Sequence, residues 1–162
     1  MPRLRLLIAG DGPEKDKLTA LAAELGVERQ VCFAGWISGG MDRFYSALDI
    51  NALTSLSETF PYALTEGARF HLATVSTAVG GIPYLIDQDV NGYLFQPGDW
   101  QALGNDLAAL GNDDELRRRL GEKLYEKAST QFSIQKTVST QLQIYAPSSA
   151  ATGGAPPPGT AW

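Results

Sequence analysis

Short apolar runs alternate with amphipathic stretches along most of the chain. Leucine, alanine and aromatic residues recur at helical spacing in the amphipathic stretches, which predict helices at 13–27, 39–49, 61–70, 99–110, 113–132 and 133–146. The apolar runs are compact and most end near glycine or proline, which is typical of buried parallel strands. These predicted strands are Leu4–Gly10, Val31–Gly35, Ile50–Ser55, Ala73–Val79 and Gly92–Pro97.

Residues with strong positional preferences mark several predicted helix ends. Gly26 is expected to cap the end of the first helix, and Pro61 is expected near the first position of the third, where its missing N–H costs nothing. Acidic residues at Asp99 and Asp113 suit the positive end of a helix dipole, and Ser133 is expected to cap the last helix.

The alternation predicts an α/β fold, with a Rossmann-like, mostly parallel sheet flanked by helices. Residues 1–146 form the predicted domain. The remainder, 147–162, is rich in proline, glycine, serine and alanine without periodicity, which predicts a disordered tail. Ligands of such sheets bind at the carboxyl ends of the strands. The loops that qualify are "GDGP", "GWISGG", "TSLSETFP" and "TAVGGIP".

Charge and composition narrow the class of partner. The chain has 162 residues, a net charge of −5 and 44% hydrophobic residues, which is typical of a globular domain. The negative charge argues against nucleic acid or an anionic membrane as the main partner. No apolar run is long enough to span a membrane, and the short run at the start of the chain fits a strand better than a signal peptide, so a cytoplasmic location is the default expectation.

A few single residues invite a functional interpretation. The lone cysteine, Cys32, is expected in the core, and the lone histidine, His71, is expected to be structural or at the surface because no partner is spaced with it. Trp36, Phe44 and Tyr45 are interpreted as core residues, although Trp36 borders a candidate loop. No pattern of metal ligands is present, so neither a metal site nor a cofactor is expected.

The segment "SLSETFPYALTEGARF" places Glu58 and Glu66 on either side of a predicted helix start. The amides of residues 58–60 could meet an anion such as a diphosphate, because helix starts carry unpaired N–H groups. Carboxylates accept hydrogen bonds from paired hydroxyls of a sugar or a ribose. The alternative is that Glu66 is an exposed helix residue and that Glu58 only complements the dipole.

The motifs "LLIAGDGPEKDKL", "VCFAGWI", "FYSALDINALTSLSETFPYALTEGAR" and "STAVGGIPYLIDQDVNGYLFQPGD" resemble, in order and spacing, the C-terminal donor-binding domain of the family 4 retaining glycosyltransferases, which is one half of a GT-B fold. The resemblance covers residues 4–145. It implies that Glu58, the candidate catalytic residue, contacts hydroxyls of the transferred sugar and that Glu66 binds the nucleotide ribose. By the same resemblance, Thr59, Phe60 and Pro61 line the sugar and diphosphate, Ile37 packs on the base, and Gly10 and Gly12 let the first loop approach the nucleotide.

The chain departs from the family pattern at several positions. Gly67 stands where alanine is usual, His71-Leu72-Ala73 where Gly-x-Pro is frequent, and Tyr84 where glutamate is common. The family also places a βα unit with an arginine and a lysine before the first strand, whereas three residues precede Leu4 here. That first strand is therefore expected to pair directly with Ile50–Ser55 or to leave an unpaired buried edge.

The resemblance implies a glycosyltransferase donor domain that binds a UDP- or GDP-linked sugar for retaining transfer of a hexosyl group. The acceptor would be a glycan or glycoconjugate bound through an N-terminal domain that this chain is expected to lack, so that the fragment alone would transfer little. Two alternatives stay open: a non-catalytic α/β module that binds a nucleotide or a partner, and a subunit of a split glycosyltransferase.

Overall fold

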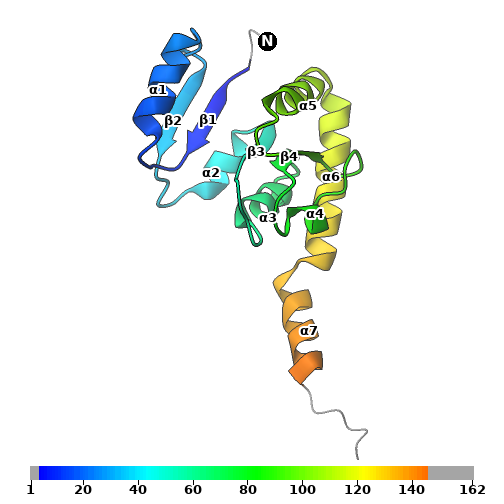
Figure 1. Cartoon of the computed structure of the whole chain (residues 1–162). Coiled ribbons are helices and arrows are strands. Elements are labelled where there is room, and N and C mark those ends of the chain that lie inside the picture. The colour runs from blue at the N-terminus through cyan, green and yellow to red at the C-terminus, as the bar shows by residue number, and fades with distance from the viewer. Residues whose placement is uncertain (1–3, 146–162) are drawn as a thin grey trace, which may run out of the picture.

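The computed structural model describes residues 4–145, so the predicted tail at 147–162 lies outside the described residues. Strands and helices alternate along most of this length (Figure 1). In chain order the elements are β1 (Leu6–Ala9), α1 (Lys15–Glu24), β2 (Val31–Gly35), α2 (Met41–Ser46), β3 (Ile50–Leu53), α3 (Tyr62–Arg69), β4 (Ala73–Thr77), α4 (Ile82–Leu85), β5 (Tyr93–Phe95), α5 (Trp100–Asn112), α6 (Asp114–Gln131) and α7 (Ile134–Tyr145).

The described strands form two parallel sheets. The order β3-β4-β5 defines the larger one, in which Ile50 lies opposite Ala73 and Val75 opposite Tyr93. Its central strand, β4, is buried along its whole length, as expected for a parallel strand covered on both faces. β1 and β2 pair with each other in the smaller sheet. The predicted α/β fold with parallel strands between helices is confirmed.

The predicted pairing of the first strand with Ile50–Ser55 is wrong, because β1 pairs with β2 and β3 pairs with β4 in the described residues. The alternative of a buried unpaired edge is only half right. Within residues 4–145 the edge of β1 away from β2 is unpaired, but Leu6 on this strand is 49% exposed. Water can therefore satisfy the free backbone groups, and no desolvation penalty forces β1 against β3.

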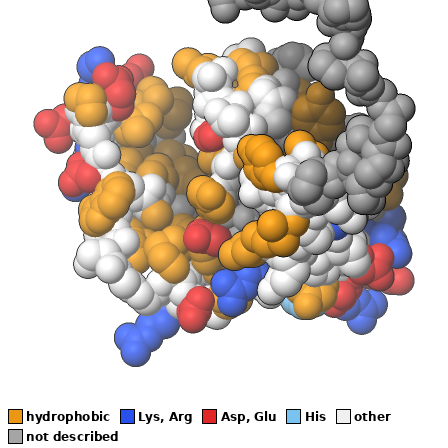
Figure 2. Space-filling view, turned by 90° about the horizontal axis from the view of Figure 1, so that it is seen from below, with side chains coloured by type: hydrophobic (Ala, Val, Ile, Leu, Met, Phe, Trp, Pro, Cys, Tyr) orange, Lys and Arg blue, Asp and Glu red, His pale blue; other side chains and the backbone are white. Residues whose placement is uncertain are grey.

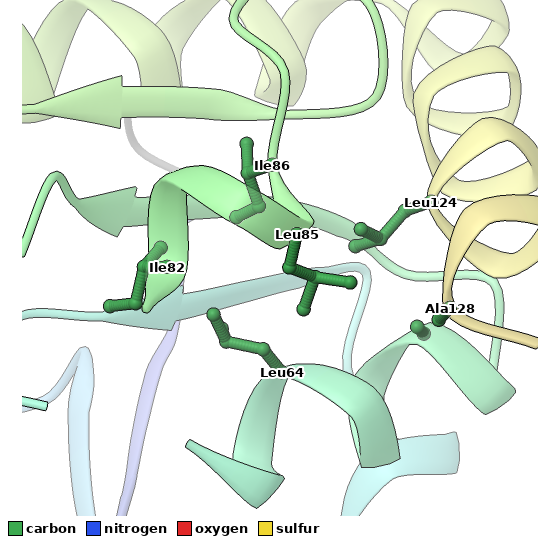
Figure 3. Packing of buried hydrophobic residues seen from close by; sticks show 7 residues of the cluster. Leu64, Ile82, Leu85, Ile86, Leu124 and Ala128 are labelled. Carbon is green, nitrogen blue, oxygen red and sulfur yellow. The ribbon is translucent and has the colours of Figure 1, made fainter. Parts of the chain in front are cut away.

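One part of the core lies between α3, α4 and α6 (Figure 3). Leu64 of α3, Leu85 of α4 and Leu124 of α6 are fully buried and point toward one another. Ala68, Ile82, Ile86 and Ala128 complete this cluster. It clamps α3 and α4 against the long helix α6, and therefore fixes the two helices that follow the loops after β3 and β4.

A second cluster joins the larger sheet to α5 and α6. Val75 of β4 and Phe95 of β5 pack with Leu110 and Leu120 from the two helices. Polar side chains in β4 are buried as well, and their hydroxyls donate to backbone carbonyls: Thr74 to Leu72, Ser76 to Thr77 and Thr77 to Ser55. No buried side-chain donor or acceptor within residues 4–145 is left without a partner.

The caps predicted from the sequence are present. Gly26 follows α1 with φ of 67°, and its N–H donates to the carbonyl of Ala23 while that of Val27 donates to Ala22, which forms a Schellman motif. The carboxylates of Asp99 and Asp113 and the hydroxyl of Ser133 accept from N–H groups three residues on. Pro61 precedes α3 as its N-cap, one position before the expected one.

The β1–α1–β2 unit is only thinly covered, which overturns two expectations. Cys32 is exposed rather than buried, because its side chain lies on a face of the small sheet that no described element covers. Trp36, expected in the core, is 79% exposed just after β2. Figure 2 shows hydrophobic side chains at the surface in the left part of the molecule, where this unit lies. The main packing contacts of the unit run between β1 and β2, and few reach the larger sheet.

The last helix, α7, extends away from the sheets (Figure 1) and buries none of its residues. Among the helices that the structure describes, none is both long and apolar enough to cross a membrane.

Candidate functional site

Glu58 lies in the loop that follows β3, at the carboxyl end of the larger sheet. Two hydroxyls organise this loop. Ser55 donates to Oε1 of Glu58 at 2.6 Å, and Thr77, the last residue of β4, donates to the carbonyl of Ser55 at 2.7 Å. The side chain of Glu58 is half-buried. One of its carboxylate oxygens is thus held by the protein, while the hydrogen bonds of residues 4–145 leave Oε2 without a donor.

The glycines of "VGGIP" pack directly against the backbone of the Glu58 loop. A Cβ at Gly80 would overlap the carbonyl oxygen of Glu58, and a Cβ at Gly81 would overlap that of Thr59. Gly80 also has φ of 55°, a left-handed conformation that side chains rarely adopt. Both glycines are therefore required for the loops after β3 and β4 to meet.

Glu66 lies on α3, the helix that begins just after the Glu58 loop. The hydroxyl of Tyr45 donates to Oε2 of Glu66 at 2.8 Å. Burial of the Tyr45 ring, and next the adjacent Glu66 carboxylate, raise the pKa of the phenol well above its ordinary value, so that it remains a hydrogen-bond donor. Tyr45 was interpreted as a core residue, and it is 3% exposed, but its polar end lies in the candidate site.

Ser55 and Tyr45 are residues that the sequence did not assign to the site: Ser55 was not singled out, and Tyr45 was interpreted as core. Each places a hydroxyl on one glutamate, but the Tyr45–Glu66 contact joins residues 21 positions apart. A contact between residues this far apart in the sequence cannot be predicted from local sequence pattern. The only available signal was the hydroxyl of each residue, on Ser55 just after β3 and on Tyr45 of α2, the helix before that strand.

The start of α3 lies between the two glutamates along the chain. Glu58 precedes it, Glu66 lies in its second turn, and Pro61, itself buried, caps it. The first N–H groups of a helix have no intrahelical partner and carry partial positive charge. Two carboxylates that accept hydrogen bonds from hydroxyls, with anion-binding amides between them, can hold a polyol and a phosphate group side by side.

Gly67, the residue after Glu66, accommodates the buried side chain of Asn51. A Cβ at Gly67 would overlap the amide nitrogen of Asn51, which donates to the carbonyl of Ala63 at 3.1 Å. Asn51 is 7% exposed and lies on β3. Gly67 is therefore matched to a polar residue on the neighbouring strand.

The remaining predicted site residues lie in or just after the β1–α1–β2 unit. Gly10 has φ of 117°, donates to the carbonyl of Gly35, and has open space around its α-carbon, as does Gly12. Ile37, after β2, is half-buried. The structure brings Gly10 and Gly12 together in one loop, but the described hydrogen bonds do not join them or Ile37 to Glu58 or Glu66.

His71 lies at the opposite end of β4 from the Glu58 loop. Its Nδ1 is 3.1 Å from a carboxylate oxygen of Glu122, and its ring lies 4.3 Å from that of Tyr125. Its backbone oxygen meets Gly121, where a Cβ would overlap it. The expected structural or surface placement of His71 is confirmed. The described residues hold no cluster of three or more side chains suited to a metal ion.

Comparison with known proteins identifies the family to which this architecture belongs. The model of the family "Glycosyl transferases group 1" matches residues 1–127. The N-acetyl-alpha-D-glucosaminyl L-malate synthase of Bacillus anthracis is 33% identical over 141 residues, and the lipopolysaccharide core biosynthesis glycosyltransferase LpsE of Rhizobium meliloti is 31% identical over 146 residues. These alignments cover 87% and 90% of this chain, which spans 37% and 43% of those two relatives.

Solved structures agree with this assignment. The C-terminal domain of the group 1 glycosyl transferase LpcC of Francisella tularensis superposes with a TM-score of 0.76 at 28% identity, covering 83% of this chain and 72% of that domain. Anabaena HepE in complex with UDP-glucose gives a TM-score of 0.80 at 26% identity, covering 89% of this chain and 41% of HepE. The chain belongs to the group 1 glycosyl transferases and corresponds to the C-terminal half of their GT-B fold.

Proposed function

We propose that this chain is the donor-binding domain of a retaining glycosyltransferase and that it holds a UDP-linked sugar at the carboxyl end of β3 and β4. The transferred group would be a hexosyl unit, and the acceptor a glycan or glycoconjugate. The observation that carries the proposal is the packing of Gly80 and Gly81 on the backbone of Glu58 and Thr59. It joins the two loops into one surface that presents both carboxylates near the start of α3.

Each residue has a distinct role in this proposal. Glu58, whose Oε2 has no donor within residues 4–145, accepts from hydroxyls of the sugar. Glu66 accepts from the ribose diol. The backbone of Thr59, Phe60 and Pro61 lines the sugar and the diphosphate, where the partial positive charge at the start of α3 opposes the phosphate charge.

The β1–α1–β2 unit supplies the other side of the nucleotide. The open, left-handed Gly10 and the unhindered Gly12 leave room for a ligand to approach the backbone of the first loop. Ile37 offers a half-buried apolar contact for the base. We favour a uridine nucleotide over a guanosine nucleotide because of HepE. HepE was solved in complex with UDP and with UDP-glucose and is 25–26% identical to this chain.

In retaining transfer of this kind, the leaving phosphate assists the acceptor hydroxyl, as the family resemblance implies. The task of the protein is then to orient the sugar and to stabilise charge that develops on the diphosphate. In this chain Glu58 orients the sugar, because Ser55 holds its carboxylate at 2.6 Å and thereby limits its rotation.

Calorimetric titration of the 162-residue chain tests the proposal. We expect saturable binding of UDP and UDP-glucose and weaker binding of GDP. Glu58→Ala should weaken binding of UDP-glucose, and Glu66→Ala should weaken both UDP ligands, each by about 10-fold or more, because a hydrogen bond to a charged group is worth about 1.5–3 kcal/mol. Glu115→Ala, an exposed glutamate at the start of α6, is the matched control. Unchanged affinities in both site variants would refute the proposal.

A further inference from the structure

The Tyr45–Glu66 pair couples a cluster of three aromatic rings, with the buried Tyr45 at its centre, to the candidate ribose site. The ring of Tyr45 stacks on Phe70 with centroids 5.5 Å apart and meets Phe44 edge-on at 5.3 Å. These contacts and the 3% exposure of Tyr45 fix its ring from both sides. Its hydroxyl is therefore a rigid donor, anchored by α2 and by the end of α3.

The Glu66 carboxylate accepts this hydrogen bond on only one of its two oxygens. Tyr45 donates to Oε2 at 2.8 Å, and the hydrogen bonds and ion pairs of residues 4–145 give Oε1 no partner. Glu66 is half-buried, so its carboxylate can be held from the protein side and still be reached by a ligand. A glutamate without such a contact would lose rotamer freedom when a ligand bound to it.

Resting on the function proposed above, we infer that Tyr45 is a positioning residue that holds Oε2 of Glu66 so that Oε1 faces the ribose diol. Tyr45 itself does not touch the nucleotide. It fixes the rotamer of Glu66 before binding, so that less conformational entropy is lost when the diol docks. The same hydrogen bond occupies one acceptor site of Oε2, which favours one orientation of the carboxylate toward the ligand.

Tyr45→Phe is the sharpest test, because it removes the hydroxyl and keeps the ring that packs on Phe44 and Phe70. The ligands are UDP and 2′,3′-dideoxy-UDP, which lacks the diol. We expect Tyr45→Phe to lower the affinity for UDP by about 5- to 20-fold and to change the affinity for dideoxy-UDP by less than about twofold. A general loss of folded protein would weaken both ligands equally, so the ratio of the two affinities isolates positioning from stability.

Three further variants complete the test. Tyr145→Phe, a hydroxyl deletion at an 80% exposed position on α7, should leave both affinities unchanged. In the Glu66→Ala background, Tyr45→Phe should add nothing to the loss of UDP affinity, since the group that it positions is gone. Incorporation of 4-aminophenylalanine at position 45, which restores an N–H donor on the same ring, should recover most of the UDP affinity and keeps the test decisive if Tyr45→Phe folds poorly.

The possible outcomes separate this inference from the proposed function. If Glu66→Ala weakens UDP and Tyr45→Phe does not, the positioning role is overturned while the ribose site stands. If Tyr45→Phe lowers the affinities for UDP and dideoxy-UDP equally, the role of Tyr45 is structural and the inference is again overturned. If Glu66→Ala binds both nucleotides as the unmodified chain does, the proposed ribose contact fails and the inference fails with it.

Discussion

Gly80 lies so close to the carbonyl oxygen of Glu58 that no side-chain atom fits between the loops after β3 and β4. This contact joins the first glutamate of the candidate site to a motif more than twenty residues further along the chain. It explains in physical terms why a glycine pair should follow β4 in a protein that uses the Glu58 loop.

Gly80→Ala should therefore damage both stability and ligand binding. We expect the free energy of unfolding to fall by about 2–4 kcal/mol, since the new Cβ overlaps the backbone and φ is left-handed. Affinity for UDP-glucose should fall by more than about 10-fold in the folded fraction, because the Glu58 loop must move. Urea denaturation and calorimetry measure the two effects.

The control for this prediction is Gly104→Ala. Gly104 lies within α5 with open space around it, and alanine favours a helix more than glycine does. The free energy of unfolding of this variant should therefore rise by about 0.5–1 kcal/mol, and its affinity for UDP-glucose should stay the same. Equal stability of Gly80→Ala and the unmodified chain would contradict the close packing of the loops.

Gly67 and Asn51 should be energetically coupled. Gly67→Ala alone should cost about 1–3 kcal/mol, because the added methyl overlaps the buried amide of Asn51. Asn51→Ala alone should also cost stability, since the bond to the carbonyl of Ala63 is lost. The double variant should lose about 1 kcal/mol less than the sum, because its methyl group enters the vacated space. Strict additivity in a urea double-mutant cycle would exclude a direct contact.

Ser55→Ala should separate sugar recognition from nucleotide recognition. Loss of the 2.6 Å bond leaves Glu58 free to rotate, so affinity for UDP-glucose should fall by about 3- to 10-fold. Affinity for UDP, which lacks the transferred sugar, should change little. Ser129→Ala on the exposed face of α6 serves as the control for deletion of a serine hydroxyl. A loss that is equal for both ligands would count against Glu58 as the sugar contact.

Tyr45 should make the stability of the chain sensitive to alkaline pH. Because burial and Glu66 raise the pKa of its phenol, the folded state retains the proton at a pH where the unfolded chain releases it. The stabilisation is therefore fully present below about pH 10 and is lost as the pH rises from there toward the folded-state pKa, at up to about 1.4 kcal/mol per pH unit.

Urea denaturation at a series of pH values checks this dependence. The difference in unfolding free energy between the unmodified chain and Tyr45→Phe should be constant from neutral pH to about pH 9 and should shrink above about pH 10. The comparison removes the contribution of other tyrosines and of lysines, which titrate in both proteins. A constant difference across the alkaline range would show that Tyr45 ionises as freely in the folded state as in the unfolded one.

The sequence by itself determined the type and order of the main elements. Apolar runs and helical spacing are local properties, so β3, α3 and β4 were predicted within a few residues, and the caps at Gly26, Asp99 and Asp113 arise from the chemistry of single side chains. The same pattern singled out Glu58 and Glu66 on either side of a helix start.

Only the tertiary structure decided which segments meet. The separation of β1 from β3, the exposure of Cys32 and the hydroxyl contacts of the two glutamates depend on distances between segments that are far apart in the sequence. Burial of an apolar run also requires a second surface to cover it, and the β1–α1–β2 unit lacks that cover in the described residues. Hydrophobicity therefore predicted where strands would form, whereas packing determined which of their side chains became core and which became site.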